Sequence, residues 1–169
     1  MALTLEGRVE FVDGMTFRGV SGSGHAVLMD SNAAVGGRGE GPLPMEAVLL
    51  AFGGCTGMDV ISILRKMRQD VNDYEVRLVG DRTEQQPTVF TDITVEHVVR
   101  GHNLNVDNVR RAIELSVTRY CPVSAMLSKG GVNITERYRV IDEATGQEQT
   151  GILSKTGASA PSAGSDSSS

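Results

Sequence analysis

Short stretches of alternating apolar and polar residues dominate the first thirty positions of the chain. Residues typical of turns interrupt this alternation at Asp13 and Gly14, and again at residues 21–24. Period-two alternation between turns is characteristic of strands in hairpins, so the pattern predicts a three-stranded meander. A loop rich in glycine and proline follows at residues 31–44.

From Met45 the spacing of apolar residues changes to that of a helix. The residues of this pattern are Val48, Leu49, Phe52, Cys55, Val60, Ile61, Leu64 and Met67. Few strongly polar residues interrupt it, so we expect a long and mostly buried helix. Gly53 and Gly54 lie inside the helix, and each costs about 1 kcal/mol relative to Ala. We therefore expect either the close approach of another backbone or a bend at this point.

Alternation returns in the second half of the chain. Residues 74–80 and 93–99 predict two long antiparallel strands joined around Pro87. Residues 132–140 predict a last strand, although Glu136 falls on its apolar face.

Two helices are predicted between these strands. Asn105 is suited to cap a helix whose apolar stripe extends to Tyr120. Cys121 precedes Pro122, and proline favours the first position of a helix while pushing the residue before it out of helical geometry. Cys121 should therefore be the N-cap of a short helix that runs through Leu127.

The predicted order of elements, βββ-α-ββ-αα-β, indicates an α+β fold rather than a doubly wound sheet. A chain of 169 residues suits one domain with a tail. We assign residues 1–141 to the domain and residues 142–169 to an acidic tail rich in Ser, Ala and Gly. Such a composition does not repay the entropy of ordering, so we expect the tail to be largely disordered.

Composition and charge exclude several classes of partner. Aromatic residues make up 4% of the chain, there is no Trp, and the net charge is −5, so we expect no nucleic-acid partner. No apolar run approaches the roughly 20 residues of a membrane span, so we expect no membrane association. The N-terminus carries no readable secretory signal, and the expected compartment is the cytoplasm.

The two cysteines are the candidates for chemistry. Cys55 has small neighbours that leave room beside its sulfur, although a thiol in this setting is more often a buried packing residue. An N-cap position directs backbone N–H groups at Cys121 and would by itself lower the pKa of that thiol. The three histidines make no metal-ligand spacing with each other or with a cysteine, so the sequence predicts no metal and no cofactor.

Two motifs carry a family resemblance. Residues 44–59, PMEAVLLAFGGCTGMD, resemble the first cysteine helix of the OsmC/Ohr family, particularly its YhfA-like branch. Residues 119–124, RYCPVS, resemble the second cysteine motif of that family. The resemblance extends from about Gly7 to Val140. It implies antiparallel sheets packed around two long central helices, in an intertwined homodimer whose active sites lie at the subunit interface.

The resemblance also implies a chemistry. Cys55 would attack an organic hydroperoxide, release an alcohol and become a sulfenic acid, which Cys121 would convert to a Cys55–Cys121 disulfide. A dithiol, such as a lipoylated protein, would reset the pair. The chain would then be an antioxidant peroxidase of the oxidative stress response.

Family members use an arginine to hold the thiolate and a glutamate to orient that arginine. Arg38, in the glycine-rich loop, is the candidate for the first role, and Arg18 is the weaker alternative. Glu46 is the candidate for the second role, although a straight helix places it opposite Cys55. Asp59 shares the face of Cys55, where a carboxylate opposes thiolate formation, so we expect a structural or interfacial role for it.

Two other interpretations stay open. The chain could be a non-catalytic protein that senses redox state or binds a small molecule in the same interface pocket, or its cysteines could serve only for packing. If it is an enzyme, we expect Leu49, Phe52 and Met58 to wall its site and to favour apolar hydroperoxides over hydrogen peroxide.

Overall fold

The computed structural model describes residues 4–156. The chain divides into two compact units, Met1–Ala51 and Phe52–Ser169, which are described separately below. Helix α1, Pro44–Lys66, begins in the first unit and continues into the second. The architecture is α+β, with two sheets and three α-helices among the described residues, as the sequence predicts.

The first unit holds the predicted meander. Strands β1 (Gly7–Asp13), β2 (Thr16–Ser21) and β3 (Ala26–Met29) pair antiparallel in that order. Gly14 makes the first turn with a φ of 57°, a conformation that favours glycine. Apolar side chains of this sheet remain uncovered in the single chain, and Phe11 is 64% exposed.

A buried carboxylate organises the glycine-rich loop after β3. Asp30 accepts backbone hydrogen bonds from Ser31 at 2.7 Å, Arg38 at 3.0 Å and Glu40 at 3.1 Å. These donors, Ser31 foremost, lower the pKa of Asp30 to about 2. The loop includes a short 3-10 helix, η1 (Ala33–Val35), and has a fixed path because one side chain ties several of its amides.

Helix α1 is apolar, as predicted, but it is not mostly buried. Only 28% of its most apolar 18-residue stretch is buried. Its buried residues are Phe52, Gly53, Thr56, Val60 and Leu64. Leu50 and Met58 are 62% and 73% exposed. A single copy of the chain therefore covers one stripe of the helix and leaves other apolar side chains open.

The same helix corrects the expectation that no apolar run approaches a membrane span. By length and composition alone, its 23 residues could cross a membrane. Counting only strictly apolar runs overlooks small residues such as Gly53 and Thr56, which apolar surroundings also tolerate. Core helices of soluble proteins meet the same criterion, and Asp59 would place a costly carboxylate within the hydrocarbon.

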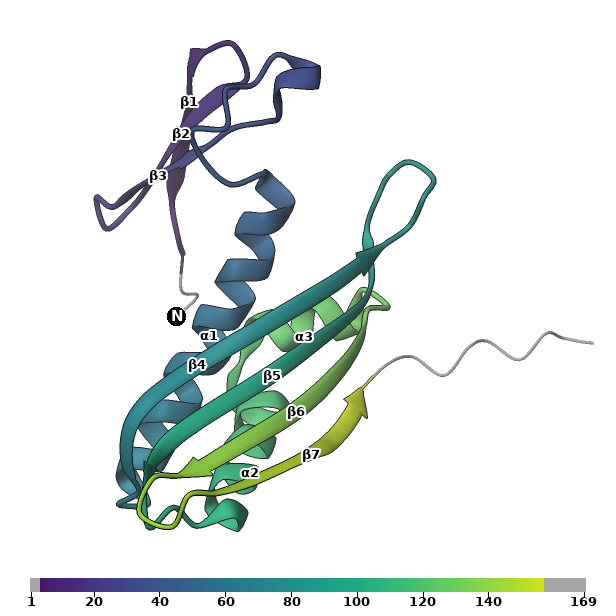
Figure 1. The fold of residues 1–169 in the computed structure, drawn as a ribbon. Helices are drawn as coiled ribbons and strands as arrows, with labels where there is room; N and C mark the ends of the chain where they lie inside the picture. The colour runs from purple at the N-terminus through teal and green to yellow at the C-terminus, as the bar shows by residue number, and fades with distance from the viewer. Residues whose placement is uncertain (1–3, 157–169) are drawn as a thin grey trace, which may run out of the picture. The chain divides into compact units, whose positions relative to one another are not determined.

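The second unit is built on a four-stranded sheet in the order β4-β5-β6-β7 (Figure 1). The strands are β4 (Asp70–Arg82), β5 (Phe90–His102), β6 (Asn133–Asp142) and β7 (Gln147–Thr156). The pairs β4–β5 and β6–β7 are antiparallel, whereas β5–β6 is parallel. This sheet is therefore mixed rather than antiparallel throughout, because the helical segment between β5 and β6 returns the chain to the end of the sheet where β5 began.

Strand β7 corrects the assignment of residues 142–169 to a disordered tail. It pairs with β6 from Gln147, opposite Asp142, to Thr156, opposite Ile134. Gly146, with a φ of 70°, permits the hairpin turn between them. Backbone pairing with β6 orders this strand, and Leu153 packs against the core. Its apolar residues are too few for composition alone to predict the strand. Residues 157–169 lie outside the described part of the chain, and the prediction for them stays untested.

The core of the second unit lies between the helices and one face of this sheet (Figure 1). Helix α2 (Val106–Leu115) is capped by Asn105, whose side chain accepts the Asn108 N–H at 3.1 Å, so the predicted cap is confirmed. The central buried residues are Val60, Leu64, Val99, Leu104, Val109, Ala112, Ile113 and Val140.

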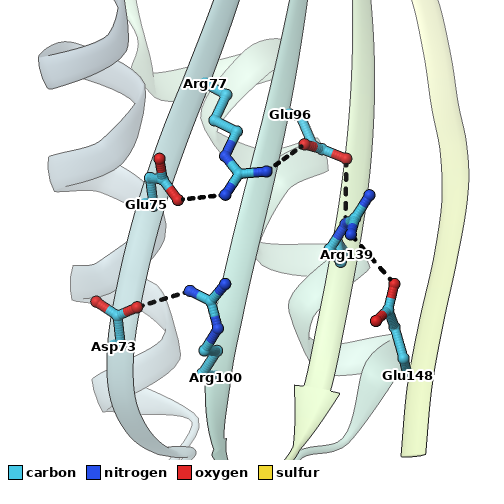
Figure 2. A network of polar contacts seen from close by, with 7 residues as sticks. All are labelled: Asp73, Glu75, Arg77, Glu96, Arg100, Arg139 and Glu148. Atoms are coloured by element: carbon cyan, nitrogen blue, oxygen red, sulfur yellow. Dashed lines mark hydrogen bonds and ion pairs between the residues drawn. The ribbon is translucent and has the colours of Figure 1, made fainter.

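The opposite face of the sheet is charged (Figure 2). One chain of ion pairs runs from Glu75 through Arg77, Glu96 and Arg139 to Glu148, and Arg100 pairs separately with Asp73 (Figure 2). The Arg100–Asp73 contact is 2.7 Å, and a hydrogen bond from Arg77 lowers the pKa of Glu75. Exposed pairs of this kind add little to the stability of the fold. Their charges indicate that this face of the sheet is in contact with solvent.

A buried polar chain crosses the inner face of three strands. Tyr74 Oη lies 2.6 Å from His97 Nδ1, and His97 Nε2 lies 3.1 Å from Glu136 Oε2. His97 and Glu136 are fully buried. Burial, with the charges of Glu136 and Asp59, raises the pKa of Tyr74, so this phenol keeps its proton and donates to His97. His97 explains why Glu136 can occupy the apolar face of β6.

Replacing Tyr74 by Phe should lower the free energy of unfolding by about 1–3 kcal/mol, because it leaves a buried imidazole nitrogen unpaired. Urea unfolding followed by circular dichroism would measure the change. Tyr120→Phe is the control, since Tyr120 is half exposed, and it should change stability by less than about 0.5 kcal/mol. Equal effects of the two variants would contradict the role given to Tyr74.

Candidate functional site

The two cysteines meet within the second unit, together with one carboxylate. The sulfur atoms of Cys55 and Cys121 and a carboxylate oxygen of Asp59 all lie within 4.8 Å of one another. Cys55 and Asp59 come from successive turns of α1, while Cys121 comes from the end of the second helical segment. The structure thus brings together the two residues named from the family resemblance, and Asp59 joins them.

A π-helical turn places Cys121. After α2 the chain continues as η2 (Ser116–Tyr120), where the Cys121 N–H donates to the Ser116 carbonyl, five residues earlier, at 2.8 Å. The expected regular helix to Tyr120 is therefore wrong in its last turn, because π geometry inserts a residue there. Cys121 then leaves helical geometry with φ −74° and ψ 104°.

Cys121 is the N-cap of α3 (Pro122–Lys129), as predicted. Its sulfur accepts the Ser124 N–H at 3.4 Å. The helix cap does not determine the pKa of the Cys121 thiol, however. Cys121 is only 3% exposed, and burial raises the pKa of its thiol to about 12. The neighbouring Cys55 sulfur adds to this rise, and the Ser124 N–H only partly offsets it. Cys121 therefore keeps its proton near neutral pH.

Cys55 is the more open thiol, since its residue is partly exposed on α1. A methyl group added at Gly54 would meet nothing within 4 Å among the described residues outside its own helix. At Gly53 the added carbon would lie 2.6 Å from Leu78 Cδ1. The close approach expected at these glycines is thus present, but a side chain of β4 makes it rather than another backbone.

Hydroxyl groups hold Asp59 in place. Ser116 Oγ donates to Asp59 Oδ2 at 3.1 Å and lies 3.0 Å from Thr56 Oγ1. A serine hydroxyl has one proton, so Thr56 must donate to Ser116 in this arrangement. Both hydroxyl residues are fully buried. The sequence singled out neither of them, although Thr56 and Asp59 belong to the motif around Cys55.

A groove of about 310 Å³ lies beside the cysteine pair, and Asp59 is the member of the site that lines it. It is lined by Asp59, Ser62, Ile63, Lys66, Leu115 and Tyr120. Positions 55, 59, 62 and 66 follow helical spacing, which would have shown from the sequence that they share a face. The expectation that Phe52 walls the site is wrong, because Phe52 is fully buried in the core.

The other predicted residues have partners within the first unit. Arg38 pairs with Asp13 at 3.1 Å and with Glu40 at 3.4 Å, while Arg18 lies 3.7 Å from Glu10.

Glu46 accepts the Leu43 N–H at 2.8 Å and so satisfies an amide at the start of α1. The roles of Arg38 toward the Cys55 thiolate and of Glu46 toward Arg38 stay predictions.

Comparison with known proteins gives consistent results. A family model described as OsmC-like protein matches residues 37–137. The protein YhfA of Escherichia coli K12 is 47% identical over 137 residues, which cover 81% of this chain and 98% of YhfA.

Solved structures share the fold. A hypothetical protein from Aquifex aeolicus VF5 superposes with a TM-score of 0.73 at 30% identity, over 84% of this chain and 99% of its own. An organic hydroperoxide resistance protein OsmC from Legionella pneumophila has a TM-score of 0.61 at 13% identity, over 83% of this chain and 98% of its own. The latter likeness concerns the fold alone.

The two thiols should differ sharply in reactivity. Burial is the largest cause of the raised pKa of Cys121 and persists when Cys55 is replaced, and the thiolate is the reactive form. We expect iodoacetamide to modify Cys121, in the Cys55→Ser variant, at least about tenfold more slowly than Cys55 in the Cys121→Ser variant. Both thiols should react alike in denaturant. Similar rates in the folded variants would show that burial does not control Cys121.

Proposed function

Because the chain belongs to the OsmC-like protein family, we propose that it is a thiol-dependent peroxidase that reduces organic hydroperoxides to alcohols. The observation that carries the proposal is the approach of the Cys55 and Cys121 sulfur atoms to within 4.8 Å. Some proteins of this fold are described as organic hydroperoxide resistance proteins, which is the activity that a pair of neighbouring thiols would support.

Cys55 takes the role of the attacking thiol because it is the more exposed of the two. Its thiolate attacks one peroxide oxygen; an S–O bond forms, the O–O bond breaks, and the leaving alkoxide takes a proton to become an alcohol. Cys55 is then a sulfenic acid. The buried Cys121 need not meet the bulky peroxide, since its partner lies beside it.

Cys121 takes the role of the resolving thiol. Its sulfur attacks the Cys55 sulfenic acid; a disulfide forms, and the hydroxyl group leaves with the thiol proton as water. An external dithiol, such as a lipoylated protein, then reduces the disulfide and restores both thiols. The reducing cytoplasm, where such dithiols are regenerated, is the proposed location.

Arg38 is proposed to stabilise the Cys55 thiolate, and Glu46 to orient Arg38. The present partners of Arg38 do not oppose this role strongly, because exposed ion pairs are worth at most about 1 kcal/mol. Asp59 works in the other direction, since a carboxylate near a thiolate raises the cost of ionisation.

The cost of ionising Cys55 beside the Asp59 carboxylate favours a second candidate function, a non-catalytic protein that senses redox state or binds a small molecule. Asp59 lies within 4.8 Å of the Cys55 sulfur, and both Arg38 and Glu46 have local partners. Such a protein would oxidise once and slowly, whereas an enzyme turns over when a dithiol is supplied.

The proposal is tested by turnover of cumene hydroperoxide with excess dihydrolipoamide. The native protein should turn over repeatedly, and Cys55→Ser should lose at least about 1,000-fold of the activity because the nucleophile is gone. Cys121→Ser should form a sulfenic acid once and then stall. Thiol titration after one equivalent of peroxide should show both thiols lost in the native protein.

Absence of turnover, with both thiols still titrating, would reject the peroxidase and leave the binding protein. Slow loss of both thiols without turnover would instead support the sensor. Hydrogen peroxide serves as the comparison substrate, and equal rates with the two peroxides would contradict the preference for apolar hydroperoxides.

We also propose that the working form is a homodimer, because exposed apolar residues such as Leu50 and Met58 need cover. Light scattering should give twice the chain mass of 18.0 kDa. Met58→Glu should weaken the dimer, while Val79→Glu, at a position that is also largely exposed but lies on the charged face of the sheet, should not. A native monomer, or equal effects of the two variants, would overturn this interface.

A further inference from the structure

We propose that the reduced chain binds a zinc ion through Cys55, Asp59 and Cys121. The three ligand atoms lie within 4.8 Å of one another. In a tetrahedral zinc site with Zn–S bonds of about 2.3 Å and Zn–O bonds of about 2.1 Å, neighbouring ligand atoms are about 3.5–3.8 Å apart. Small rotations of three side chains that already converge would therefore close the site around an ion.

The chemistry of the donors selects the class of metal. Two thiolates with one carboxylate suit a borderline-soft cation such as Zn²⁺, whereas Mg²⁺ and Ca²⁺ require oxygen ligands throughout. The partial exposure of Cys55 leaves room for water at the fourth position. Three protein ligands with one open position form the pattern of reactive rather than purely structural zinc sites.

The surrounding hydrogen bonds also suit a metal site. Ser116 Oγ donates to Asp59 Oδ2, which fixes the carboxylate and leaves its other oxygen available. The Ser124 N–H donates to the Cys121 sulfur and would stabilise negative charge on it. A cation between the three ligands would also relieve the repulsion that Asp59 otherwise exerts on a Cys55 thiolate.

Zinc binding and oxidation of the cysteines exclude each other. Coordination replaces the two thiol protons, which leave as two H⁺, and uses both sulfur atoms as ligands. A Cys55–Cys121 disulfide consumes those same ligands. Bound zinc should therefore protect the cysteines from peroxide. The site itself depends only on the reduced thiols and Asp59, so it does not rest on the proposed peroxidase activity.

The test uses the full chain, reduced and free of oxygen, with Zn²⁺ in titration calorimetry and Co²⁺ as a spectroscopic probe. We expect one ion per chain, thiolate-to-cobalt charge-transfer bands, and tetrahedral d–d bands. Calorimetry in buffers of different ionisation enthalpy should show proton release on binding. Protein oxidised to the disulfide should not bind.

Asp59→Asn should weaken binding at least about tenfold, and Ser116→Ala should weaken it about ten- to a hundredfold by freeing the carboxylate. Asp107→Asn, which removes an exposed carboxylate on α2, is the matched control and should change nothing. Cys121→Ser should abolish the charge-transfer bands of a two-thiolate site.

Native affinity in Asp59→Asn, or equal binding by the disulfide form, would overturn the zinc site. Circular dichroism checks that each variant is folded, and Ser116→Ala provides the deciding result if Asp59→Asn is not. No peroxide is present in these measurements. Loss of the zinc site would therefore leave the peroxidase assay untouched, and failure of that assay would leave the zinc titration valid.

Discussion

Ser116 joins the elements on which the site depends. Its carbonyl accepts the Cys121 N–H through the π-helical turn, and its hydroxyl donates to Asp59 while lying against Thr56. One buried residue thus ties the backbone that carries Cys121 to the helix that carries Cys55. Without this link, the two sulfur atoms would be positioned only by the packing of separate helices. The approach of the thiols is therefore a property of a specific hydrogen-bonded junction.

The sheet provides the rigid support for this junction because its two faces have opposite character. The outer face is solvated and carries the ion pairs, while the inner face packs against α2 and the second part of α1. The inner face also accommodates Tyr74, His97 and Glu136, whose polar atoms bond mainly to each other. A buried chain of hydrogen bonds that links three strands resists sliding of one strand against the next.

Much of the fold follows from local patterns in the sequence. Period-two alternation marks the meander and the long strands, and Asn105 and Cys121 cap their helices as local chemistry requires. The parallel pairing of β5 with β6 and the existence of β7 depend on contacts between distant segments, which local patterns do not contain. The π-helical turn lengthens the spacing of its hydrogen bonds by one residue, and the amino-acid composition of residues 116–120 does not indicate it.

The site is predictable in a different way. Its cysteines are visible in two short motifs, but the acidity of Cys121 depends on burial that the sequence does not specify, and burial outweighs the effect of the helix cap. Asp59 is visible as a neighbour of Cys55 on the helix, whereas its link to Ser116 requires the folded chain.

The capping role of Cys121 has a consequence for how this position evolves. Serine is among the preferred N-cap residues, and its hydroxyl could accept the same Ser124 N–H that the sulfur accepts. Helix formation and packing alone would therefore accept a mutation from Cys to Ser with little loss. The fold does not by itself preserve sulfur at position 121, so a thiol maintained there over generations would reflect selection for its chemistry.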